Sequence, residues 1–173
     1  LMKKPKKIGF GIDIKSSSIM NANNLGTYDE VKKGDIRYLP FKNESVKSVY
    51  SNMIDDVKKE DLKKVFTEIH RVLKNKRCVV FTTPLENYKK YLYFYNKSKE
   101  FKKKGYMKNA KLFMKYDRGR SDWESRPLSF WKTFLKNNSF KIVDYAYYAD
   151  KNMVELWDVG FRPFFQHLIS IKE

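Results

Sequence analysis

The sequence predicts an α/β protein built around a mostly parallel sheet. Its clearest helix runs from about Glu60 to Asn75, where apolar residues recur at intervals of three and four and form one stripe. A strand-like segment precedes this helix at Ser48–Met53, and another follows at Cys78–Thr83, which Pro84 ends. Strand, helix and strand in this order predict parallel strands joined by a right-handed crossover.

The N-terminal part begins with a further strand. Ile8–Ile14 has the composition of a short buried strand with Asp13 near its end. Its glycines do not form a phosphate-binding loop, because no helical pattern opens at Ile14. The polar segment Ser16–Asn24 suits a short helix, and a turn at Gly26 leads through Val31 to the turn Gly34-Asp35.

The region from 85 to 120 is expected to be a helical insertion after a strand. It carries two helical stripes separated by Gly105, namely Tyr88, Tyr91, Leu92 and Tyr95, then Met107, Ala110, Phe113 and Met114. A further helix is predicted from Leu128 to Asn137. Three later segments have strand-like composition, and the turn near Asp150–Asn152 predicts an antiparallel hairpin at the sheet edge: Lys141–Tyr148, Val154–Val159 and Gln166–Ile171.

The totals fit one globular domain over residues 1–173. Of these residues 42% are hydrophobic, and no apolar run approaches the length of a membrane span. A single cysteine, Cys78, has no partner for an internal disulfide, which favours a cytoplasmic location. Two histidines and one cysteine offer no metal-ligand spacing, and no Ser-His-Asp or Cys-His arrangement is evident.

The net charge of +17 allows two interpretations. Lysine-rich solvated faces explain most of it, because lysine outnumbers arginine and arginine is the better bidentate phosphate ligand. The charge is uneven, however: twelve basic and three acidic residues lie between Glu86 and Arg120, a net +9. We treat this local cluster as a candidate functional feature.

Four motifs in order make the chain similar to a known family. They are Gly34-Asp35-Ile36 with Leu39-Pro40-Phe41, then Ser48–Asn52, His70–Lys74 and Val79–Thr83. Together they resemble the middle of a class I S-adenosylmethionine-dependent methyltransferase. The resemblance is good over about Ile8 to Pro84 and looser from Ser125 to Ile171, and it implies a Rossmann-like, doubly wound sheet.

The resemblance also implies the residues of a cofactor site. Asp13 matches the acid that binds both ribose hydroxyls, and Asp35 matches the acid that accepts a hydrogen bond from the adenine amino group. The neighbours Ile14 and Ile36 complete these two positions, with the apolar residue after Asp35 packing on the adenine ring. At the carboxyl end of the next strand, Ser51, Asn52 and Met53 should line the ligand crevice.

Three departures from the family pattern stand out. No opening strand with an acidic GxGxG turn precedes Ile8, Lys47 replaces the usual aspartate, and Asn75-Lys76 replaces a Pro-Gly turn. A central strand cannot be removed without exposing two strand edges. We therefore expect residues upstream of Leu1 to complete the domain and the methionine half of the cofactor site.

The resemblance implies an enzyme that transfers a methyl group from S-adenosylmethionine to a small or carrier-linked acceptor. Candidate acceptor ligands are the aromatic and cationic side chains of the insertion, Tyr88, Tyr91, Arg118 and Arg120, the arginines suiting an anionic acceptor. No catalytic residue is identified, because an activated methyl group needs mainly positioning. The alternatives are a nucleic-acid-binding protein or RNA-directed methyltransferase that uses the basic insertion, and a non-catalytic protein of the same fold.

Overall fold

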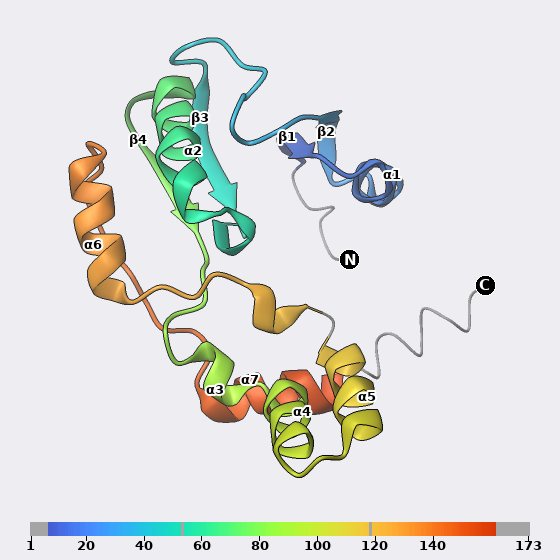
Figure 1. The fold of residues 1–173 in the computed structure, drawn as a ribbon. Coiled ribbons are helices and arrows are strands. Elements are labelled where there is room, and N and C mark those ends of the chain that lie inside the picture. The colour runs from blue at the N-terminus through green and yellow to red at the C-terminus, as the bar shows by residue number, and fades with distance from the viewer. Residues whose placement is uncertain (1–6, 53, 118, 162–173) are drawn as a thin grey trace, which may run out of the picture. The chain divides into compact units, whose positions relative to one another are not determined.

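The computed structural model describes residues 7–52, 54–117 and 119–161. The chain forms two compact units, Leu1–Ser51 with Lys58–Phe81, and Asn52–Val57 with Thr82–Glu173. Figure 1 shows their elements in chain order, from blue at the N-terminus to red.

The first unit opens with a β-α-β arrangement. Strands β1 (Ile8–Asp13) and β2 (Tyr28–Lys33) pair in parallel, and helix α1 (Ser16–Leu25) connects them. Gly26 ends α1 in the left-handed conformation, with φ of 63°, which glycine adopts without steric cost. The register joins Ile8 to Tyr28 and Asp13 to Lys33, so both strands end at the same edge.

A second β-α-β arrangement carries the apolar core of this unit. Strands β3 (Val46–Ser51) and β4 (Leu73–Phe81) pair in parallel around helix α2 (Lys59–Val72). The predicted stripe of α2 is fully buried, and the Phe66 ring meets the Phe81 ring edge-on with centroids 5.5 Å apart. The buried residues of the stripe are Leu62, Val65, Phe66, Ile69 and Val72. The amphipathic pattern therefore predicted the face of this helix correctly.

The end of α2 differs from its prediction. The helix ends at Val72 instead of Asn75, and β4 begins at Leu73 instead of Cys78. The pairing jumps from Val46–Leu73 to Ser48–Cys78, so several residues of β4 bulge out of register. Lys76 lies in this bulge with φ of 56°. The turn expected at Asn75-Lys76 is thus present as an irregularity within the strand.

The described strands form two separate parallel pairs. Parallel pairing and helical crossovers confirm the α/β class, as two β-α-β arrangements in succession. Within the described residues, β1 pairs only with β2, and β3 only with β4. The single sheet that the sequence predicts is therefore not formed by these four strands alone.

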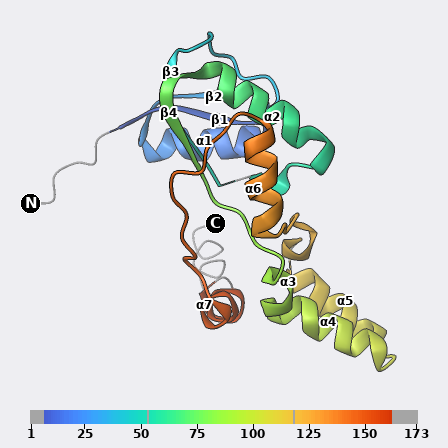
Figure 2. The ribbon, with the colours of Figure 1, turned by 90° about the vertical axis from the view of Figure 1, so that its left-hand side faces the viewer.

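The second unit is helical. Helices α3 (Tyr88–Tyr91), α4 (Tyr93–Lys103) and α5 (Met107–Asp117) occupy the predicted insertion. Both views show α4 and α5 side by side as a hairpin (Figures 1 and 2). Phe101 and Phe113 pack between them with ring centroids 5.1 Å apart, and the Ser98 hydroxyl donates to the Ala110 carbonyl at 2.8 Å. The helices predicted for this region are confirmed.

The rest of this unit contradicts the predicted hairpin of strands. Helix α6 (Leu128–Asn137) lies where it is expected, but residues 141–150 form no regular structure. Val154–Val159 is helical, in α7 (Lys151–Leu156) and the π-helical turn η3 (Trp157–Phe161). Gln166–Ile171 lies outside the described residues. Among the described helices, none is long and apolar enough to cross a membrane.

Candidate functional site

The carboxyl edge of β1 and β2 brings two predicted cofactor segments together. Asp13 ends β1, and Gly34 follows β2 directly; the Gly34 amide donates to the Asp13 carbonyl at 3.0 Å. A Cβ at position 34 would lie 3.0 Å from the Ile12 side chain. Glycine is therefore needed here because the backbone passes close to β1. The turn Gly34-Asp35 was predicted at this edge.

The Asp13 side chain keeps acceptor capacity at this edge. Its Oδ1 accepts from the backbone amide of Lys15 at 2.7 Å, which fixes the carboxylate in a tight turn. Among the described residues no donor contacts Oδ2. Ile14 follows with an exposed side chain. A half-buried carboxylate with one open oxygen suits a pair of hydroxyl donors.

Asp35 is bound by a residue that the sequence interpretation missed. Arg37 donates to both carboxylate oxygens, with Nη2–Oδ2 at 2.7 Å and Nε–Oδ1 at 3.1 Å. These hydrogen bonds hold the pKa of the Asp35 carboxyl below its ordinary value. Arg37 also pairs with Asp61 of α2 at 3.0 Å. The turn that contains Ile36 is therefore fixed to the helix, and the contact of Asp35 with adenine stays a prediction.

Helix α2 also holds the next loop. Glu68 accepts from the Leu39 amide at 2.8 Å, and Arg71 donates to the carbonyls of Leu39 at 3.0 Å and of Phe41 at 2.8 Å. Glu68 and Arg71 pair with each other at 2.7 Å, which lowers the pKa of Glu68. The motif Leu39-Pro40-Phe41 is thus positioned by two charged side chains of one helix face. No local sequence signal identified this role.

The third predicted group lies at the end of β3. Ser51 is buried and paired in register with Phe81 at the end of β4, so both strands end at one edge. Asn52 follows with an exposed side chain. Met53 lies outside the described residues. The roles of Ser51 and Asn52 in lining a crevice stay predictions.

In the second unit, a buried charge cluster surrounds the turn η1 (Ile54–Asp56). The Glu124 amide donates to the Asp55 carbonyl at 3.0 Å, and Arg126 donates to the Val57 carbonyl at 2.8 Å. The Arg126 side chain is only 6% exposed. The segment from Glu124 to Arg126 therefore fixes η1. The sequence analysis did not single out these residues.

Asp55 is the buried acid of this cluster. It is 4% exposed, and burial raises the pKa of its carboxyl to about 6, against the attraction of Arg120 and Arg126. Among the described residues, no basic side chain forms an ion pair with Asp55; that of Arg126 pairs with Glu124. A buried carboxyl with a raised pKa is an unusual group, and such groups gather at functional sites.

Two predicted acceptor ligands, Tyr88 and Arg120, meet at Trp123. The Tyr88 ring stacks on the Trp123 ring with centroids 5.7 Å apart, and the Arg120 guanidinium lies 4.3 Å from the same ring. Arg120 also faces Trp157 at 5.2 Å. Its Nε is buried and has no hydrogen-bond acceptor within the described part of the chain. Arg118 lies outside the described residues.

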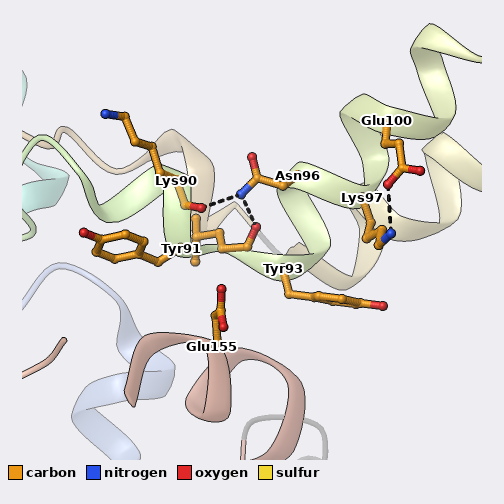
Figure 3. A pocket seen from close by; sticks show the side chains of 8 residues that line it. Lys90, Tyr91, Tyr93, Asn96, Lys97, Glu100 and Glu155 are labelled. Carbon is orange, nitrogen blue, oxygen red and sulfur yellow. Dashed lines mark hydrogen bonds and ion pairs between the residues drawn. The ribbon is translucent and has the colours of Figure 1, made fainter. Parts of the chain in front are cut away.

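Tyr91 belongs to a different place in the same unit. It lines an open depression of about 190 Å³ with Lys90, Asn96 and Glu155, as Figure 3 shows. The Asn96 amide donates to backbone carbonyls of α3, among them that of Lys90 at 3.1 Å, so it is committed to structure. Neither Tyr88 nor Arg120 lines this depression. The four predicted acceptor ligands therefore do not form one cluster.

Solved structures of similar fold include two that cover most of this chain. The YcgJ protein of Bacillus subtilis is similar with a TM-score of 0.51 at 15% identity, over 93% of this chain and 65% of its own. A structure from Thermotoga maritima described as an S-adenosylmethionine-dependent methyltransferase is similar with a TM-score of 0.51 at 18% identity, over 78% of this chain and 56% of its own. At these identities the similarity establishes the α/β fold.

The family comparison places the similarity in the N-terminal part. Residues 2–81 match the family model described as a methyltransferase domain, which confirms the resemblance to class I S-adenosylmethionine-dependent methyltransferases. Another similar structure is the PH0226 protein of Pyrococcus horikoshii, 29% identical over 42% of this chain and 38% of its own, with a TM-score of 0.39. The chain thus spans less than two thirds of the length of these relatives. A comparison with curated proteins found no match.

Proposed function

We propose that this chain acts in a methyltransferase that uses S-adenosylmethionine. The observation that carries this proposal is the edge where Gly34 meets Asp13, since it lies within the matched methyltransferase segment. In this proposal the open oxygen of Asp13 accepts from the ribose hydroxyls, and Ile36 packs against the adenine ring. S-adenosylmethionine supplies an activated methyl group, so the chain's own residues need only bind and orient.

The role of Asp35 in this proposal is shared with Arg37. Arg37 uses both carboxylate oxygens, so an adenine amino group must share an oxygen with it or displace one of its bonds. Asp35 therefore contributes first by fixing the turn and second as an acceptor. Because Arg37 fixes the Asp35 carboxylate, we expect its removal to change the affinity for the cofactor, although the Arg37 side chain has no hydrogen-bond acceptor of its own.

Calorimetric titration of the complete gene product with S-adenosylmethionine tests the proposal. Asp13→Asn is expected to weaken binding at least tenfold, because an amide presents one acceptor oxygen in place of two. Asp29→Asn is the matched control, since Asp29 is an exposed acid within β2 and away from the edge. Wild-type protein that binds no cofactor, or equal losses in the two variants, would refute the assignment.

The acceptor is inferred to be a small or carrier-linked molecule with an anionic group. Arg120 supports this inference, because its guanidinium is held by two tryptophans while its buried Nε lacks an acceptor among the described residues. Transfer of a tritiated methyl group into a metabolite extract should label acid-soluble anions, and Arg120→Lys should reduce that label. Label confined to nuclease-sensitive precipitate would overturn this acceptor class.

A further inference from the structure

The α4–α5 hairpin carries lysines that differ in whether their charge is compensated. Glu100 pairs with Lys97 at 2.8 Å and with Lys104 at 2.7 Å, and these bonds lower the pKa of Glu100 to about 2. The other acid, Asp117, is buried and accepts from the Ser121 hydroxyl at 2.8 Å. No acid on the hairpin is therefore left to balance the remaining lysines.

Six exposed lysines make up this uncompensated set, which we call the lysine face. They are Lys99, Lys102 and Lys103 on α4, and Lys108, Lys111 and Lys115 on α5. Within the described residues none of them forms an ion pair. The Lys99 ammonium lies 5.2 Å from the centroid of the Tyr95 ring.

Their spacing places like charges side by side. Lys99 and Lys103, and Lys111 and Lys115, are four residues apart, and Lys108 precedes Lys111 by three. Like charges at these spacings destabilise a helix when nothing neutralises them. Local features that oppose the fold are expected mainly where function requires them. An anionic partner would remove this repulsion on both helices.

The position of the lysines on α5 indicates the kind of partner. At about 100° per residue, Lys108, Lys111 and Lys115 fall opposite the buried side of α5, where Ala110 and Phe113 pack inward. The exposed apolar residues Leu112 and Met114 lie on the two flanks of this lysine stripe. A helix that lies on a membrane has apolar residues at the centre of its exposed face. The charge distribution on α5 therefore favours a polyanion over a membrane surface as the binding partner.

Aromatic side chains accompany the lysines. Tyr106 is 58% exposed at the hairpin turn, and Tyr116 is 49% exposed one residue after Lys115. Exposed aromatic rings beside cationic side chains are the combination that binds single-stranded nucleic acid, by base stacking and phosphate contact. An acidic protein surface would make use of the lysines but not of the rings.

We propose that the lysine face, with Tyr106 and Tyr116, binds single-stranded nucleic acid. The phosphates lie along the outer sides of α4 and α5 and neutralise the six lysines. Lys97 and Lys104 take no part, since Glu100 already neutralises them. Binding of this kind requires neither S-adenosylmethionine nor methyl transfer, so its success or failure is separate from that of the proposed enzyme activity.

Fluorescence anisotropy with a fluorescein-labelled 20-nucleotide oligouridine measures this binding without cofactor. Six phosphate contacts predict that log affinity falls with log salt at a slope of about −4. The triple variant Lys108→Gln, Lys111→Gln and Lys115→Gln should reduce that slope to about −2. Tyr106→Leu, which keeps an apolar group beside Phe101, should weaken binding about tenfold.

A matched variant separates a local site from the overall charge. Lys15→Gln, Lys42→Gln and Lys47→Gln remove the same charge from exposed positions of the first unit and should leave affinity within about twofold. Circular dichroism checks that both triple variants fold. Equal losses in the two variants, a salt slope near zero, or binding to polyglutamate or anionic vesicles as tight as to RNA would overturn the proposal.

Discussion

The amide of Gly34 donates a 3.0 Å hydrogen bond to the carbonyl of Asp13. This bond joins the ends of two parallel strands, so the turn that contains Asp35 and Ile36 starts beside the Asp13 carboxylate. The carboxyl ends of parallel strands are where such folds bind ligands. The close approach of the two strands also explains the glycine at position 34, because a Cβ there would lie 3.0 Å from the Ile12 side chain.

Gly34→Ala should therefore destabilise the protein and weaken cofactor binding together. The new methyl group must displace Ile12, a β-branched side chain with few alternative rotamers, and we expect a loss of about 1–2 kcal/mol in the free energy of unfolding. Urea denaturation and calorimetric titration measure the two effects. Gly9→Ala is the control, because no atom of the described residues lies within 4 Å of a Cβ at that position. Equal stability of both variants would contradict the close approach.

Sequence patterns predicted those parts of the fold that depend on neighbouring residues. The stripe of α2 was visible because six apolar residues recur at helical spacing; all six are buried, although the last, Leu73, begins β4 instead of ending the helix. Composition predicted β1, but the placement of Asp13 and Gly34 at neighbouring strand ends followed from the resemblance, and β2 was not predicted from its composition. Arg71 could not be assigned, because its carbonyl acceptors in Leu39 and Phe41 lie some thirty residues away in the chain.

The C-terminal part shows why composition alone was insufficient. Residues 141–148 are rich in β-branched and aromatic residues, yet Val143 is 88% exposed and no described strand pairs with the segment. Strand composition has little value without a partner and a buried face. Asp150 was interpreted as a turn residue, but its carboxylate accepts from the Met153 amide at 2.9 Å and starts α7. Aspartate suits both roles, and the cap prevailed.

Arg71→Ala should loosen the loop that contains Leu39 and Phe41. The change removes the donors to both backbone carbonyls and leaves Glu68 without its cation. We expect a loss of about 1–2 kcal/mol, limited because water can reach the partly exposed site. Arg71→Lys should lose most of the same energy, since an ammonium group cannot form the bidentate contact.

Urea midpoints and amide hydrogen exchange of residues 39–43 measure the effect of these variants. Arg77→Ala is the control, an exposed arginine on β4 with no ion pair among the described residues. Exchange rates of the loop that stay unchanged in Arg71→Ala would show that Glu68 alone holds it.

Lys76→Gly should stabilise the protein. Lys76 has φ of 56° in the bulge of β4, a conformation that costs a residue with a side chain roughly 1 kcal/mol and glycine almost nothing. We expect a gain of about 0.5–1 kcal/mol, partly offset by the greater freedom of glycine in the unfolded chain. Lys74→Gly, in the same strand without positive φ, should instead lose stability. If the urea midpoint rises in Lys74→Gly and not in Lys76→Gly, the backbone at position 76 is not strained.

Asp55→Asn should stabilise the protein at neutral pH but not in acid. Burial raises the pKa of Asp55 to about 6, so the folded state holds this proton more tightly than the unfolded state does. The protonated Asp55 carboxyl therefore makes its full contribution to the stability of the folded state below about pH 4. This contribution is lost as the pH rises through about 6. Asparagine carries no charge to bury, and we expect a gain of about 2–3 kcal/mol in the free energy of unfolding at pH 7.5 that vanishes near pH 4.

Urea midpoints at both pH values measure the difference, with the exposed Asp56→Asn as the control. A less stable Asp55→Asn at pH 7.5 would mean that the charge of Asp55 is needed to hold Arg120 and Arg126 in place.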